Sequence, residues 1–147
     1  AIQSLLKAAT DLGDSGVLAA VTLISALYLA FFRCHRAVIA LLLSFGFAVC
    51  GIAFAKLAFL GCLPAGGMQL QSPSGHAALS AATYFILASI LASQFRRPMR
   101  LLIHSTAIFL IAVIAYSRVG LGFHSANEVL AGLSIGAAAA LTGYIYL

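Results

Sequence analysis

The chain has 147 residues, of which 63% are hydrophobic and only 7% are charged, and its mean hydropathy is +1.11. A soluble domain carries roughly a quarter of its residues as charged side chains, so this composition excludes a water-soluble globular domain. The formal net charge of +5 does not indicate nucleic-acid binding, because the basic residues stand in short gaps between apolar runs rather than along one helical face. No Pro/Gly/Ser-rich linker divides the chain, so residues 1–147 are expected to form a single membrane-integral domain.

The first predicted element, residues 1–13, is short and amphipathic. It places Leu5 and Leu6 beside Lys7 and Asp11, a mixture typical of a helix lying at the membrane interface. The remnant of a further membrane span that begins upstream is the alternative interpretation. The segment lacks the basic and apolar regions of a signal peptide.

Five later segments are long and apolar enough to cross a bilayer, which takes about 20 helical residues. They lie near residues 15–32, 37–60, 75–95, 101–117 and 125–147. Backbone polar groups within hydrocarbon must bond internally, and none of the runs alternates as a strand does, so all five are expected to be helices. The predicted fold is therefore an all-α, polytopic transmembrane helix bundle of about five spans with an N-terminal interfacial helix.

The gaps between the spans predict the orientation. Two gaps on the same side of the membrane carry the basic residues Arg33, Arg36, Arg96, Arg97 and Arg100. The positive-inside rule makes this side cytoplasmic and places the opposite side in the periplasm or cell exterior of a bacterial inner membrane.

The opposite side gathers the chemically versatile residues Lys56, Ser74, His76, Arg118, His124 and Glu128. An ionisable group within a membrane span is costly and is taken as functional by default. These residues are therefore the candidate site.

Ser74 and Gly75 lead into the span near 75–95, directly before His76. Ser74 is a good N-cap, and Gly75 allows a ligand to approach the backbone. A helix N-terminus presents free N–H groups and partial positive charge, which favour an anion. An ordinary capped helix start with an unrelated histidine is the alternative.

The second motif is Arg118, followed by His124 and Glu128. His124 and Glu128 have the spacing of neighbours on one helix face, so the carboxylate can hold one ring nitrogen and present the other. An oriented neutral imidazole can act as a nucleophile or a base. The alternative interpretation is that His124 and Glu128 form an interfacial ion pair with no catalytic role.

Lys56 lies near the outer end of the span at 37–60, where simple snorkelling of the ammonium group to lipid headgroups is the alternative role. Together with Arg118 and the helix N-terminus it supplies positive charge for a phosphate. Two histidines on separate helices suit attack on phosphorus and protonation of the leaving oxygen. The chain has only three acidic residues, so we expect no metal and no other cofactor.

The motifs Pro73-Ser74-Gly75-His76 and Ser117-Arg118-x5-His124-x3-Glu128 resemble the second and third signatures of the type-2 phosphatidic acid phosphatase superfamily, in its membrane-integral branch. The first signature of that family is Lys, six residues, then Arg-Pro. Lys56 and Pro64 stand at this spacing here, but Leu63 occupies the arginine position.

The resemblance implies a metal-independent phosphatase that hydrolyses a lipid-linked phosphate or diphosphate at the outer membrane face. His124 would form a phosphohistidine and His76 would protonate the leaving group, while the substrate phosphate would be held by Lys56, Ser74, Gly75 and Arg118. Glu128, the orienting carboxylate, stands where the family usually has aspartate. Leu63 and Glu128 motivate an alternative, a non-catalytic member that binds lipid phosphate or a membrane protein partner.

Other small residues favour packing roles. The three cysteines, Cys34, Cys50 and Cys62, have no CxxC spacing and are expected to act as apolar packing residues. Gly132 and Gly136 form a GxxxG pair, which predicts close helix packing within the chain or in a homo-oligomer.

Overall fold

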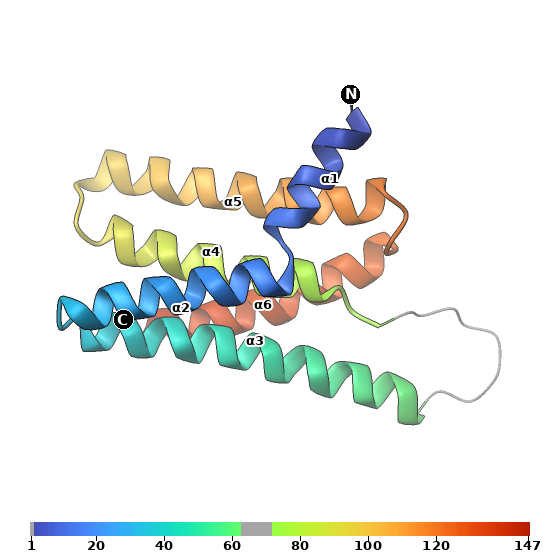
Figure 1. Ribbon diagram of the computed structural model, residues 1–147, viewed down its shortest axis with the longest axis horizontal. Coiled ribbons are helices and arrows are strands. Elements are labelled where there is room, and N and C mark those ends of the chain that lie inside the picture. Colours follow the sequence, from blue (N-terminus) through green and yellow to red (C-terminus); the bar gives the residue numbers. More distant parts are fainter. Residues whose placement is uncertain (1, 63–71) are drawn as a thin grey trace.

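Six helices follow one another along the computed structural model, which describes residues 2–62 and 72–147, and no strand occurs among those residues. The helices are α1 (Ile2–Leu12), α2 (Ser15–Phe31), α3 (His35–Cys62), α4 (Gly75–Ala92), α5 (Arg97–Gly120) and α6 (Ala126–Tyr146). Helices α2 to α6 run along the long axis of the bundle, and α1 crosses it at an angle (Figure 1).

Helices α3, α4, α5 and α6 each contain a stretch long and apolar enough to span a membrane. Helix α2 has 17 residues and is long enough to span a membrane only when it is taken together with α1. The two helices meet at a bend of 45°. The predicted all-α polytopic bundle of about five spans is confirmed, and the chain is a multi-pass membrane protein. Helix α5 begins earlier than predicted because Pro98 occupies its first turn, where proline is tolerated.

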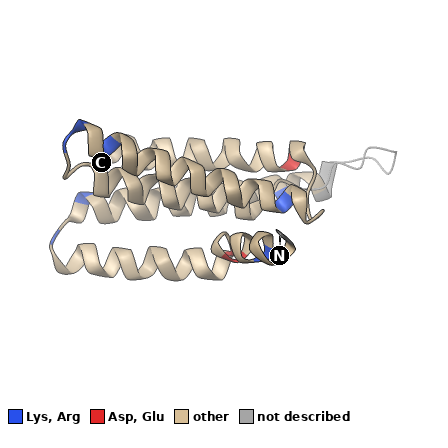
Figure 2. Cartoon of the chain, turned by 90° about the horizontal axis from the view of Figure 1, so that it is seen from above, with Lys and Arg blue, Asp and Glu red and all other residues tan. Residues whose placement is uncertain are grey.

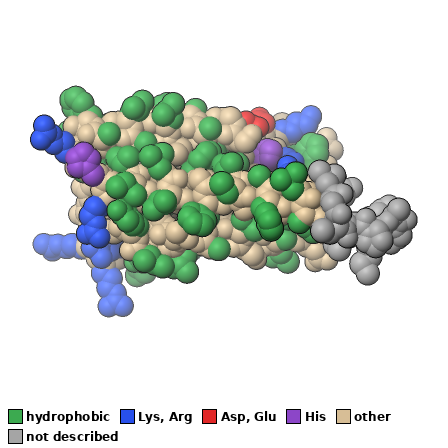
Figure 3. Space-filling model, turned by 90° about the horizontal axis from the view of Figure 1, so that it is seen from below, with side chains coloured by type: hydrophobic (Ala, Val, Ile, Leu, Met, Phe, Trp, Pro, Cys, Tyr) green, Lys and Arg blue, Asp and Glu red, His purple; other side chains and the backbone are tan. Residues whose placement is uncertain are grey.

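The surface of the bundle agrees with a lipid environment. Large hydrophobic side chains cover its flank between two more polar ends (Figure 3). The end that holds the C-terminus carries the arginines of the α2–α3 and α4–α5 connections (Figure 2). We call this the arginine end and the opposite one the site end.

Helix α4 is the centre of the bundle and packs against α2, α3, α5 and α6. Of its residues 67% are buried, against 33% or less in an equal stretch of the other spanning helices. Its buried positions are mostly small, including Ala77, Ala78, Ser80, Ala81 and Ala82. Small side chains let helix backbones approach closely, which is how helices associate in lipid.

Three glycines let α6 lie directly on its neighbours. A Cβ atom at Gly132 would collide with the Ser74 carbonyl group, and one at Gly136 would collide with the Ala78 carbonyl group of α4. A Cβ atom at Gly143 would likewise collide with a backbone carbonyl group of α3. The GxxxG pair therefore serves packing within the chain.

We predict that Gly136→Ala destabilises the bundle by about 1–3 kcal/mol, because the added methyl group forces α6 away from α4. Gly46→Ala is the matched control: Gly46 lies within α3 and has open space where its Cβ would stand. That change should be neutral or stabilise the helix by about 0.5–1 kcal/mol. Thermal unfolding midpoints in detergent measure both effects, and equal shifts for the two variants would contradict the packing argument.

Candidate active site

Four helix ends bring the predicted site residues together at the site end. The electrostatic field at His76, in the first turn of α4, includes contributions from Lys56 of α3, Arg118 of α5 and His124, which precedes α6. These four residues therefore lie in one neighbourhood at the site end. Leu63 and Pro64, from the first motif of the resemblance, lie outside the described residues.

Glu128 holds His124 in one orientation. The imidazole Nδ1 lies 2.9 Å from Glu128 Oε2, and the Glu128 side chain is only 4% exposed. The same oxygen accepts a hydrogen bond from the Ser125 N–H at 3.1 Å, and the Ser125 hydroxyl caps the Glu128 N–H at 3.4 Å. Glu128 therefore both completes a capping box for α6 and orients the His124 imidazole ring.

The backbone joins this unit to the start of α4. The Ser74 N–H donates to the Glu128 carbonyl oxygen at 3.1 Å, and Ser74 is fully buried beneath Gly132. The Ser74 hydroxyl accepts from the Ala77 N–H and caps α4, as predicted. A Cβ at Gly75 would make only an ordinary contact with Ile52, so close helix packing does not demand glycine there.

Arg118 is a largely buried cation, 8% exposed, in the last turn of α5. Its guanidinium carbon lies 4.5 Å from the centroid of the Phe123 ring, within cation–π range. Its carbonyl oxygen accepts from the Phe123 and His124 N–H groups, so the turn that carries His124 folds back onto Arg118. Its Nε is buried without a hydrogen-bond partner among the described residues, an unfavourable arrangement that an anion would relieve.

One acidic residue that the sequence analysis did not place in the site also reaches it. Asp14 Oδ2 lies 3.9 Å from His76 Nε2. Asp14 is the N-cap of α2, a role that the sequence Gly13-Asp14-Ser15 suggests locally, but nothing local connects it with His76. Within residues 2–62 and 72–147, no cluster of three or more histidine, cysteine or acidic side chains has the geometry of a metal site.

Comparison with known proteins points to one family. A profile of the PAP2 superfamily matches residues 37–147, which include every predicted site residue, whereas Asp14 precedes the match. The chain is 39% identical over 97 residues to an uncharacterised 22.5 kDa protein in the cps region of Klebsiella pneumoniae. That alignment covers 65% of this chain but only 46% of the relative, so the chain spans about half of the relative's length. No solved structure matches the chain.

The His124–Glu128 contact predicts which imidazole nitrogen carries the proton. A carboxylate only accepts hydrogen bonds, so Nδ1 should be protonated and Nε2 should keep its lone pair in the neutral ring. Nitrogen-15 NMR of labelled histidine should show this tautomer, and Glu128→Ala should abolish the preference. Ser125→Ala is the control: it removes the helix cap but leaves the pair. An Nε2-protonated ring in the parent protein would contradict the prediction.

Proposed function

Because the chain belongs to the PAP2 superfamily, we propose that it is a membrane-embedded, metal-independent phosphatase acting on a lipid-linked phosphate or diphosphate. Membership in a phosphatase superfamily supports the reaction class. The observation that carries the proposal is the oriented His124–Glu128 pair beside Arg118, a buried cation with an unpartnered N–H.

In the proposed reaction, His124 Nε2 attacks phosphorus and the bond from phosphorus to the leaving oxygen breaks. The leaving oxygen takes the proton from His76 as the phosphohistidine forms. Water then attacks the phosphohistidine, gives its proton to His76 and releases inorganic phosphate, which restores both rings. Glu128 keeps its negative charge throughout and stabilises the His124 ring while it is cationic.

Fixed positive groups take the place of a metal ion in this scheme. In this scheme Lys56 and Arg118, which both contribute to the electrostatic field at His76, would face the negative phosphoryl oxygens together with the N-terminus of α4, where Ser74 and the Gly75 N–H lie. Charge that develops on those oxygens is stabilised by donors already in position.

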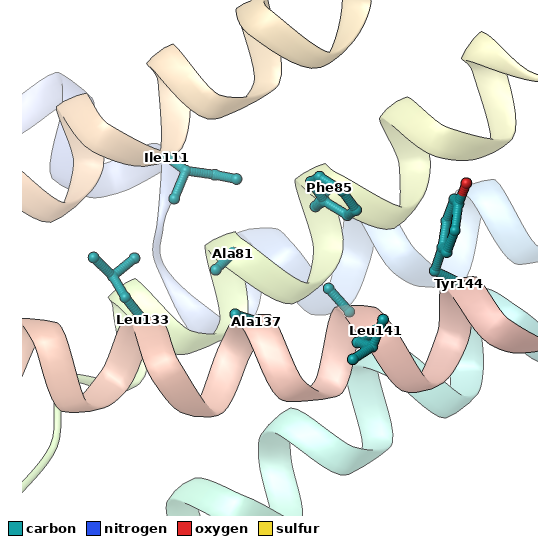
Figure 4. A pocket seen from close by; sticks show the side chains of 8 residues that line it. Ala81, Phe85, Ile111, Leu133, Ala137, Leu141 and Tyr144 are labelled. Carbon is teal, nitrogen blue, oxygen red and sulfur yellow. The ribbon is translucent and has the colours of Figure 1, made fainter.

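An apolar cavity supports a lipid as the substrate. Beneath the site, Ala77, Ala115 and Val129 form a buried cluster between α4, α5 and α6. A cavity of about 550 Å³ begins one helical turn further along each of these helices. Figure 4 shows its lining residues, which are Ala81, Phe85, Ile111, Leu133, Ala137, Ala140, Leu141 and Tyr144. Its size is that of a small-molecule site, and exposed Leu141 and Tyr144 place its rim on the lipid-facing surface.

The charge distribution supports an outward-facing site. The arginine end carries Arg33, Arg36, Arg96, Arg97 and Arg100, which the positive-inside rule places in the cytoplasm. The site end would then face the periplasm or cell exterior of an inner membrane, and its substrate would come from the outer leaflet.

The test is phosphate release by purified protein from isoprenoid and diacylglycerol phosphates and diphosphates. Turnover should persist in chelator and should be inhibited by vanadate, which mimics five-coordinate phosphorus. His124→Ala should abolish turnover, because in the proposed mechanism the His124 imidazole is the group that attacks phosphorus. His35→Ala, at the arginine end, is the matched control and should retain full activity. An absolute metal requirement, or unchanged turnover in His124→Ala, would refute the mechanism.

Leu63, in the usual arginine position, motivates the second candidate function, a protein that binds lipid phosphate without hydrolysing it. Leu63→Arg should separate the two, because a guanidinium contact contributes about 1.5–3 kcal/mol of charge-assisted hydrogen bonding. If that contact strengthens in the transition state, turnover should rise roughly ten- to a hundredfold.

Leu63→Met, which adds length without charge, is the control and should leave turnover near the parent value. A gain with Leu63→Arg that disappears on adding His124→Ala would identify a phosphatase. Tight binding of a lipid phosphate without turnover by either the parent or Leu63→Arg would instead establish the binding protein.

A further inference from the structure

The carboxylate of Asp14 has a different partner on each oxygen. Oδ1 accepts hydrogen bonds from the Gly16 N–H at 2.8 Å and the Val17 N–H at 3.4 Å, which caps α2. Oδ2 points the other way and lies 3.9 Å from His76 Nε2. The cap fixes the carboxylate, so its second oxygen is held towards the imidazole without a further loss of side-chain freedom.

The corner between α1 and α2 is itself anchored beside the site. The Tyr84 hydroxyl of α4 donates to the Leu12 carbonyl oxygen at 2.7 Å, and Thr10 is hydrogen-bonded to Ser117 of α5 at 2.7 Å. Gly13 packs so closely that a Cβ atom there would overlap the side chain of Ile114 and contact that of His76. The position of Asp14 thus follows from contacts with both α4 and α5.

The effect of the Asp14 carboxylate on His76 follows from the other charges around that ring. Lys56, Arg118 and His124 act on His76 as cations or potential cations, and Asp14 is the acidic member of that group. The remaining carboxylate nearby, Glu128, is paired with His124. Burial of His76 and the cations that attract the substrate phosphate disfavour a proton on its ring, and Asp14 opposes them.

We propose that Asp14 is a positioning residue that favours the imidazolium form of His76, the form that can give a proton to the leaving oxygen. The inference rests on the proposed phosphatase function. As the bond from phosphorus breaks, the leaving oxygen takes a proton from the imidazolium ring and His76 becomes neutral. Water returns a proton to His76 in the second step, and Asp14 stays ionised throughout. Helices α1 and α2, which precede the family match, thereby contribute to the site.

Substitutions at Asp14 can separate its charge from its capping role. Asp14→Asn and Asp14→Ser keep a good N-cap and remove the charge, whereas Asp14→Glu keeps the charge and weakens the cap. For an alkyl phosphate, whose leaving group needs a proton, kcat should fall about three- to fivefold in the Asn and Ser variants, the size expected of a half-exposed ion pair. For p-nitrophenyl phosphate, whose leaving group needs no proton, kcat should change little in the Asn and Ser variants. Asp14→Glu should retain the activity on both esters.

A double-mutant cycle tests whether the effect passes through His76. In a His76→Gln background, Asp14→Asn should cost nothing further, because the proton donor is already gone. An equal loss with both esters, or an undiminished loss in the His76→Gln background, would overturn the proposal and leave Asp14 a structural cap.

A measurement without turnover separates this inference from the proposed function. The imidazolium fraction of His76 at neutral pH, read by NMR of labelled histidine, should drop in Asp14→Asn and Asp14→Ser and be retained in Asp14→Glu. A drop in a protein that hydrolyses no lipid phosphate would support the ion pair while the phosphatase proposal fails. An unchanged fraction in a protein that does turn over substrate would refute the role of Asp14 alone.

Discussion

The beginnings of α4 and α6 are held together by one backbone hydrogen bond, from the Ser74 N–H to the Glu128 carbonyl oxygen, where Gly132 leaves no side chain between the helices. The N-terminal end of α4 is thereby fixed beside the carboxylate that orients His124 at the start of α6. A larger residue at Gly132 would separate these ends, and the imidazole would lose its place relative to the helix N-terminus. Geometry of this kind matters because a displacement of about 1 Å can cost on the order of a hundredfold in rate.

The membrane explains why so few polar residues are concentrated so tightly. Ionisable groups in hydrocarbon are costly unless they have partners, and in this chain the charged residues lie towards the site end or the arginine end (Figure 2). At the site end the partners are specific: Glu128 pairs with His124, Arg118 lies over Phe123, and Asp14 faces His76. Arg118 keeps an unpartnered N–H among the described residues, which the phosphate of the proposed substrate would satisfy.

The arrangement also separates two tasks that a metal ion would otherwise combine. In the proposed mechanism Lys56, Arg118 and the helix N-terminus provide positive charge for the phosphate, while each of the two carboxylates acts on one histidine. Glu128 holds His124 by a hydrogen bond of 2.9 Å within one helical turn, whereas Asp14 comes from another part of the chain and lies 3.9 Å from His76. The longer side chain of Glu128, in place of the usual aspartate, reaches the His124 ring and the Ser125 N–H with the same oxygen.

The sequence by itself determined what depends on neighbours along the chain: the apolar spans, the cap at Ser74 and the His124–Glu128 spacing. These follow from helical periodicity and local hydrogen bonding, which act within one or two turns. Only the tertiary structure decided that α1 bends onto α5, that Gly132 and Gly136 pack within the chain, and that Asp14 reaches His76. Those contacts join residues far apart in sequence, so they depend on how whole helices pack and leave no periodic signal in the segments themselves.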